Sequence, residues 1–186
     1  KQLNFPQTIS DSSIKGIILV EICDKVVCDA LSQFNLPIVS VDMPNVPFEE
    51  LNGIDVVTME SKKNLKKIIN QLIEKGAESF GFVGDLYSPN VSRGFQERYN
   101  ALSECLAEHQ LPLNQKNCLL HQTPEDFRNF QTTVNNLQAM ISLPDVFICG
   151  NDWTAIQLIY ALQFLGFQIP KDICVVGFDN IPAASR

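Results

Sequence analysis

Short runs of apolar residues alternate with stretches of helical periodicity along the whole chain. The apolar runs are four or five residues long, rich in Val and Ile, and bounded by polar or Gly-containing turns, which predicts strands at 16–20, 37–41, 55–58, 79–83, 146–149 and 173–177. Strands that lack polar alternation and are separated by helices are typical of a parallel sheet with crossover helices. The pattern therefore predicts an α/β protein.

The predicted helices differ in how much polar surface they present. Between Lys62 and Gly76, apolar residues recur at spacings of three and four, which predicts an amphipathic helix that ends at the glycine. Further helices are predicted from near Glu97 and from Pro124 to about Met140. The helix from Asp152 to Leu165 has almost no polar face. We expect it either to be buried on all sides or to form a subunit interface.

The stretch from Met43 to Gly53 contains two prolines, two acidic residues and no periodicity. We interpret it as the crossover between two lobes. The region before it has only two clear strands, which is too few for an independent lobe, so the first lobe is expected to be incomplete in this chain.

Composition and charge exclude several classes of protein. The net charge of −7 argues against a nucleic-acid-binding surface, because phosphate contacts need clustered Lys and Arg. Six cysteines include no CxxC pair, and several lie in apolar runs, so we expect buried thiols in a reducing cytoplasm, no metal site and no cofactor. No apolar run is long enough to span a bilayer, no signal peptide begins at Lys1, and phosphate-loop or nucleophile-elbow motifs are absent.

Polar residues follow the last two predicted strands. Asn151 and Asp152 come after one strand, and Asp179 and Asn180 come after the next. In an open parallel sheet a ligand binds at the carboxyl ends of the strands, so these side chains are candidates for a binding site. Their alternative interpretation is structural, since the same residue types also form turns and helix N-caps.

The order of these motifs resembles the lactose/galactose-repressor family of transcriptional regulators. The resemblance rests first on VFICGNDWTA at 146–155 and DICVVGFDN at 172–180. Weaker matches precede them in the expected order: IKGIIL at 14–19, LPIVSVD at 36–42, LIEKG and FGFVG at 72–76 and 80–84, and ERYNAL at 97–102. Each motif alone is weak, but their order and spacing run through most of the chain.

The resemblance implies a two-lobed, periplasmic-binding-protein-like fold of parallel sheets flanked by helices. Residues 1–57 would belong to the N-terminal lobe and 58–186 to the C-terminal lobe, while the helix-turn-helix DNA-binding domain would be absent from this chain. It also implies effector-binding residues, which are Arg98, Asn151 and Asp179 in the cleft, with Asp42 and Asp152 near it. The alternatives are an exposed helix residue for Arg98 and a helix cap for Asp152.

Two further residues are candidates for the same site. Phe127 could stack on a ligand ring, although its helical spacing favours core packing, and Arg93 competes with Arg98 for the position in the loop. A rigid donor fork facing a carboxylate suits a sugar, a sugar phosphate or a purine.

The expected function is effector binding and dimerisation in a DNA-binding repressor. Its partners would be the small-molecule effector, a second copy of the chain and operator DNA, bound through the absent domain, with no membrane. The alternative is an extracytoplasmic sugar-binding protein of a transporter. A third class, a doubly wound enzyme, has only the fold in its favour.

Overall fold

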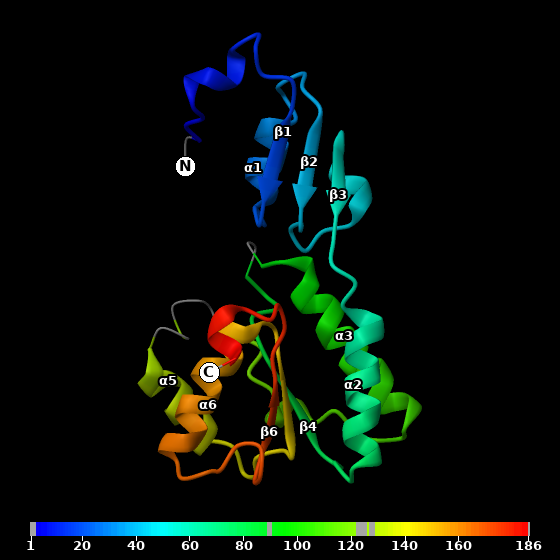
Figure 1. Cartoon of the computed structure of the whole chain (residues 1–186), viewed down its shortest axis with the longest axis vertical. Helices are drawn as coiled ribbons and strands as arrows, with labels where there is room; N and C mark the ends of the chain where they lie inside the picture. Colours follow the sequence, from blue (N-terminus) through cyan, green and yellow to red (C-terminus); the bar gives the residue numbers. More distant parts are fainter. Residues whose placement is uncertain (1–2, 89–90, 122–125, 127–128, 186) are drawn as a thin grey trace. The chain divides into compact units, whose positions relative to one another are not determined.

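The computed structural model describes residues 3–88, 91–121, 126 and 129–185. The chain divides into two compact units, Lys1–Glu60 with Pro89–Gln96 and Ser61–Ser88 with Glu97–Arg186. Each unit has its own parallel sheet (Figure 1). The α/β architecture predicted from the alternating pattern is therefore confirmed.

The first unit is built on the parallel sheet β1-β2-β3. Its strands are Ile17–Val20, Ile38–Val41 and Ile54–Val57, and the short helix α1, Lys25–Leu31, begins at Asp24, whose side chain accepts from the backbone N–H of Val26. Alternate strand residues such as Leu19 and Ile38 are buried, whereas Ile18 and Val20 are 73% and 62% exposed. The sheet has one buried face and one exposed apolar face, although parallel sheets are normally covered on both.

The stretch from Met43 to Gly53 does not connect the two units, so its interpretation as the crossover is wrong. It lies within the first unit and joins β2 to the parallel neighbour β3 through a 3-10 turn, η2 at Phe48–Glu50. The prolines and the missing periodicity belong to this irregular loop. The chain leaves the first unit between β3 and α2, and the segment from Val91 to Gln96 returns to it. The predicted first lobe ends at residue 57 and includes no such return.

The second unit is built on the parallel sheet β4-β5-β6. Its strands are Phe80–Val83, Val146–Cys149 and Cys174–Val176. Helices α2, Lys62–Glu74, and α3, Arg93–Glu108, lie on one side of this sheet, and α5, Phe130–Gln138, and α6, Asp152–Phe164, lie on the other (Figure 1). Three 3-10 turns complete the described elements: η1, Gln7–Ser10, in the first unit, and η3, Gln115–Asn117, and η4, Pro182–Ser185, in the second.

Two helices begin at residues other than the predicted ones. Helix α3 begins at Arg93 rather than near Glu97. Helix α5 begins at Phe130, where the side chain of Asn129 accepts from the N–H of Thr132, and part of the helix predicted from Pro124 lies outside the described residues.

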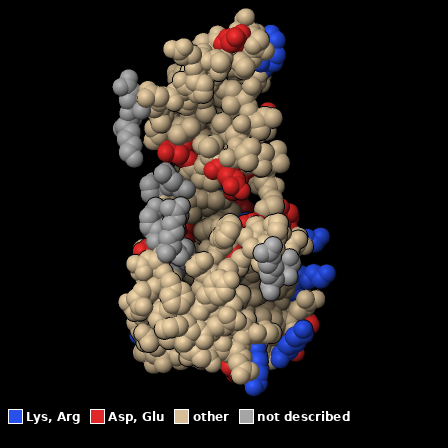
Figure 2. Space-filling view, turned by 60° about the vertical axis from the view of Figure 1, so that its left-hand side comes forward, with Lys and Arg blue, Asp and Glu red and all other residues tan. Residues whose placement is uncertain are grey.

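Basic side chains form no single continuous patch on the face shown in Figure 2, where most lie along the lower right-hand edge. Figure 2 shows Lys and Arg as separate spots on the face that it displays. Lys62 and Lys66 of α2 are paired with Glu104 and Glu108 of α3 at 2.8 to 3.1 Å, so part of the positive charge is neutralised within the unit. Among the described residues no helix is long and apolar enough to cross a membrane.

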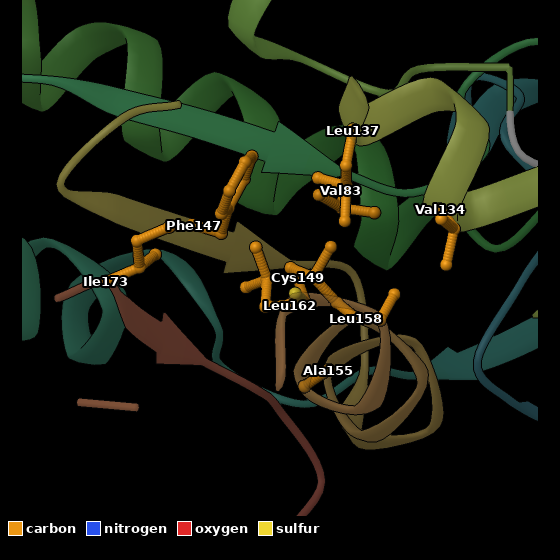
Figure 3. Packing of buried hydrophobic residues seen from close by; sticks show 10 residues of the cluster. Val83, Val134, Leu137, Phe147, Cys149, Ala155, Leu158, Leu162 and Ile173 are labelled. Carbon is orange, nitrogen blue, oxygen red and sulfur yellow. The ribbon is translucent and has the colours of Figure 1, made fainter. Parts of the chain in front are cut away.

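One hydrophobic core of the second unit lies between the sheet and helices α5 and α6. Figure 3 shows Phe147 and Cys149 of the central strand β5 facing Leu158 and Leu162 of α6, with Val134 of α5 beside them. All four residues of β4 and all four of β5 are buried, which explains why these strands read as continuous apolar runs.

Asp145 joins the amino-terminal ends of β4 and β5. Its Oδ2 accepts from the Ser79 hydroxyl and from the backbone N–H groups of Glu78 and Ser79 at 2.8 to 2.9 Å. Burial by itself would raise the pKa of Asp145, but these hydrogen bonds outweigh it and hold the pKa below the ordinary value of 3.8. The carboxylate form therefore stabilises the folded unit.

Replacing Asp145 with Ala should lower the free energy of unfolding by about 1 kcal/mol at neutral pH, because the hydrogen bonds are largely exposed. A lowered folded-state pKa gives stability that is complete above pH 3.8 and is lost as the pH falls through the folded-state value. Urea denaturation of both proteins between pH 7 and pH 2 measures this. Glu74→Ala, another exposed carboxylate of the same unit, serves as the control. A wild-type advantage that persists undiminished at pH 2 would contradict the assignment.

Candidate functional site

The carboxyl edge of the second sheet gathers most of the candidate binding residues. Residues 150–152 follow β5 and residues 177–180 follow β6, while Arg98 reaches the same edge from α3. Gly150 extends the pairing of β5 with β4 through its N–H, which donates to the carbonyl of Val83 at 2.8 Å. The main chain that carries the site is therefore a continuation of the sheet.

Arg98 is the centre of this arrangement. It is only 6% exposed, because it lies on the face of α3 that also carries the buried residues Ala101, Leu102 and Cys105. Its Nη1 donates to the carbonyl of Gly150, and its guanidinium carbon lies 3.6 Å from the centre of the Phe178 ring. The burial excludes the interpretation of Arg98 as an exposed helix residue.

Asp179 lies beside this guanidinium. Its Oδ1 is 3.9 Å from Arg98 Nη2, and its side chain is 33% exposed. The structure thus brings Arg98 and Asp179 together, as the resemblance implied. The neighbouring positive charge orients the carboxylate, which is one-third exposed.

The turn that carries Asp179 has an unusual backbone. Asp179 and Asn180 have φ angles of +104° and +55°, which L residues other than Asn and Asp rarely adopt. Such conformations persist where the surroundings enforce them. The positions of both side chains therefore depend on what holds the turn.

The helix cap is Asn151, and not Asp152 as the sequence had suggested. Asn151 is the N-cap of α6, since its Oδ1 accepts from the N–H of Thr154 at 2.9 Å. Asp152 does not cap the helix; its buried Oδ2 accepts from the N–H of Ile181 at 2.9 Å, and its own N–H donates to the carbonyl of Phe178 at 2.8 Å. Asp152 thus holds the turn at 178–181.

Gly177 has a structural role that the sequence pattern did not reveal. A Cβ at this residue would lie 2.1 Å from Oδ1 of Asp152 and 3.3 Å from the Cβ of Ala155. Only glycine lets the strand end come this close to the carboxylate. The sequence shows a glycine in the VVGFDN run. The requirement for glycine there comes from packing against Asp152 and Ala155, which the sequence does not show.

Asp42 belongs to the first unit and is not brought together with these residues within one unit. Its φ is +70°, its Oδ1 accepts from the N–H of Met43 at 2.7 Å, and its Oδ2 accepts from the hydroxyl of Ser92 at 2.6 Å. Asp42 therefore fixes the returning segment onto β2. Arg93, the other candidate cation, donates from Nη1 to the carbonyl of Val46 at 2.7 Å in the same unit.

The thiols are poor candidates for chemistry. Burial, helped by the Asp42 carboxylate, raises the pKa of Cys23 to about 12, and burial also raises the pKa of Cys149. Within the described ranges no three His, Cys, Asp or Glu side chains are grouped as metal ligands would be. Phe127, the proposed stacking residue, lies outside the described residues.

Comparison with known proteins gives a consistent result. A family model described as a periplasmic binding protein-like domain matches residues 69–186. Catabolite control protein A of Staphylococcus xylosus is 33% identical over 132 residues, which are 69% of this chain and 37% of that protein. The ribose operon repressor of Haemophilus influenzae is 25% identical over 181 residues, 96% of this chain and 51% of the repressor. This chain therefore spans only part of the length of these relatives.

Solved structures agree with this in fold. A LacI family transcriptional regulator from Lactobacillus casei superposes with a TM-score of 0.70 at 20% identity, over 94% of this chain and 62% of that protein. The periplasmic-binding-protein-like architecture predicted from the motifs is confirmed by this likeness and by the family match.

Asp152→Ala should destabilise the second unit by about 2 kcal/mol, because the N–H of Ile181 loses its buried acceptor. Gly177→Ala should cost at least as much, because its methyl group meets the Asp152 carboxylate. The two losses should not add, since removing the carboxylate also removes the clash. Urea denaturation of both single variants and the double variant gives the coupling. Strictly additive losses would show that the carboxylate and the glycine act independently.

Proposed function

This chain belongs to the periplasmic binding protein-like domain family, and from that premise we propose that it is the effector-binding region of a transcriptional repressor. The observation that carries the proposal is the buried guanidinium of Arg98, stacked on Phe178 and 3.9 Å from the partly exposed Asp179 carboxylate. The curated relatives reported above are regulators, which favours this function over a transporter's sugar-binding protein.

The arrangement suits a neutral, hydroxyl-rich ligand. Asp179 can accept hydrogen bonds from hydroxyl groups, and Asn151 can donate from Nδ2 at the same edge. Arg98 is already committed to Gly150 and Phe178, and the neighbouring Asp179 carboxylate would repel a phosphate. We therefore place neutral sugars ahead of sugar phosphates and purines as effectors.

DNA would be bound by a segment outside these residues. The chain carries a net charge of −7, and basic side chains on the face in Figure 2 stand apart from one another. An effector then regulates DNA binding if it binds one conformation of the protein more tightly than another.

A second copy of the chain is the proposed partner of helix α6. One side of this helix packs on the sheet through Leu158 and Leu162, but Trp153, Tyr160 and Phe164 are 61%, 56% and 67% exposed. Phe130 of α5 packs edge-on against Phe164, with ring centres 5.5 Å apart, and extends the patch. An exposed aromatic patch of this kind is typical of a protein interface.

Asp179→Asn should weaken effector binding by about tenfold, because the charged acceptor is lost while Asn tolerates a positive φ. A thermal-shift screen of the full-length protein against neutral sugars, sugar phosphates and purines measures this, since a ligand of the native state raises Tm. The control is Asp29→Asn, an exposed carboxylate paired with Lys25 on α1. Equal ligand-induced shifts of Tm in Asp179→Asn and Asp29→Asn would contradict this placement of the site.

Tyr160→Lys should dissociate the dimer, because it places a charge in the centre of the aromatic patch. Sedimentation velocity of the wild type and the variant over a range of concentrations measures the change. Met59→Lys, at a similarly exposed apolar residue of the first unit, should leave the dimer intact. A Tyr160→Lys protein that sediments as wild type would contradict an interface on α6.

A further inference from the structure

The turn between η2 and β3 contains the one Asn-Gly pair of the sequence, Asn52-Gly53. The N–H of Ile54 donates to the carbonyl of Leu51 at 3.1 Å and closes a tight turn, in which Gly53 has a φ of +73°. A positive φ in the second half of such a turn is typical of type II and favours glycine. Asn52 and Gly53 are both exposed, so the pair lies on the surface of the first unit.

The amide nitrogen of Gly53 is accessible. Its N–H makes no hydrogen bond to any residue that the structure describes, and apart from its chain neighbours no heavy atom lies within 4 Å of the point where a Cβ would stand. The peptide group between Asn52 and Gly53 is held instead at its carbonyl oxygen, which accepts from Oγ of Ser32 at 3.2 Å. The nitrogen of this peptide group therefore faces open space next to the Asn52 side chain.

Two other exposed asparagines of the first unit have a different environment. Asn35 is followed by Leu36 and Asn45 is followed by Val46, and each of these following residues has a side chain beside its nitrogen. The N–H groups of Leu36 and Val46 also donate to main-chain carbonyls, at 2.6 and 2.8 Å. Asn35 and Asn45 are therefore internal comparisons for Asn52, with equal exposure but an obstructed and hydrogen-bonded neighbour.

We propose that Asn52 is a site of spontaneous deamidation, which converts it to aspartate and isoaspartate. The Gly53 nitrogen loses its proton to a base in solution and attacks Cγ of Asn52, and the absence of a Cβ at Gly53 leaves this approach open. The new N–Cγ bond closes a succinimide ring, while the side-chain nitrogen takes a proton from water and leaves as ammonia. Water then opens the ring. Cleavage of the N–Cγ bond gives aspartate, and cleavage of the original peptide bond gives isoaspartate.

Isoaspartate at this position would disturb the start of β3. The main chain then passes through the side-chain carbons of residue 52, which lengthens it by one carbon directly before the strand. Ile54, the first residue of β3, is only 8% exposed and pairs in register with Ile38 of β2. A longer connection and a new carboxylate before this buried pair should lower the stability of the first unit.

Ser32 controls how readily the reaction occurs. The peptide plane between Asn52 and Gly53 must rotate for its nitrogen to reach Cγ, and the hydrogen bond from Ser32 Oγ to the carbonyl opposes that rotation. Ser32 is the C-cap of α1, and its Oγ also lies 3.0 Å from the carbonyl of Cys28, so the hydroxyl can donate to either oxygen. The restraint on the turn is therefore partial, and its removal should accelerate deamidation.

The test is incubation of the full-length protein at mildly acidic and mildly alkaline pH, followed by peptide mass spectrometry. The peptide with Asn52 should gain roughly 1 Da, because NH₂ is replaced by OH, and should do so faster at alkaline pH. Peptides with Asn35 and Asn45 should change several times more slowly. A protein isoaspartyl methyltransferase should methylate part of the product. An Asn52 peptide that keeps its mass, or that changes no faster than the Asn35 peptide, would overturn the proposal.

Three variants complete the test. Asn52→Gln should accept no methyl group at this turn, because its longer side chain closes the ring poorly, and its Tm should not fall on incubation as that of the wild type does. Ser32→Ala should deamidate several times faster than the wild type, whereas Gln33→Ala, which removes a hydrogen bond to the Asp29 carbonyl at the same helix end, should not. Urea denaturation shows whether both variants keep their fold. Equal rates in Ser32→Ala and Gln33→Ala would overturn the role of Ser32.

Discussion

The conformation of the carboxyl edge of the second sheet depends on the contacts of the buried Arg98 guanidinium. A charge that is 6% exposed is costly unless it is compensated, and here the compensation comes from the Gly150 carbonyl, the Phe178 ring and the Asp179 carboxylate. These groups belong to the ends of two different strands, while Arg98 belongs to a helix. One side chain therefore connects the helix to the ends of both strands. Removing it would remove the contacts that hold these three segments together.

Asp152 provides the matching constraint from the other side of the turn. Its carboxylate accepts from Ile181, and its own N–H donates to Phe178, the ring on which Arg98 stacks. Because the turn includes two residues with positive φ, it needs such external support to stay in place. The guanidinium and the carboxylate thus position Asp179 jointly, one through charge and the other through the backbone.

Much of the fold was readable from the sequence, because the strands of the second unit are continuous apolar runs. The run 146–149 was predicted with the bounds that β5 has, since a central parallel strand is buried on both faces. The stretch from Met43 to Gly53 was misinterpreted because a loop within a lobe and a linker between lobes share the same composition. Which of Asn151 and Asp152 caps the helix could not be predicted, since either residue can accept from a helix N-terminus. The need for glycine at position 177 depends on contacts between distant segments that no local pattern contains.

The described thiols and carboxylates of this region contribute mainly to the structure. Acid–base or nucleophilic catalysis needs a group that changes protonation or exposes a reactive form near neutral pH. The buried thiols of Cys23 and Cys149 have raised pKa values and remain protonated there, so neither supplies a thiolate. Asp42 and Asp152 already accept from fixed hydrogen-bond donors, and Asp179 lies beside a permanent cation. These carboxylates thus position the chain: Asp42 holds the returning segment against β2, and Asp152 holds the turn that carries Asp179.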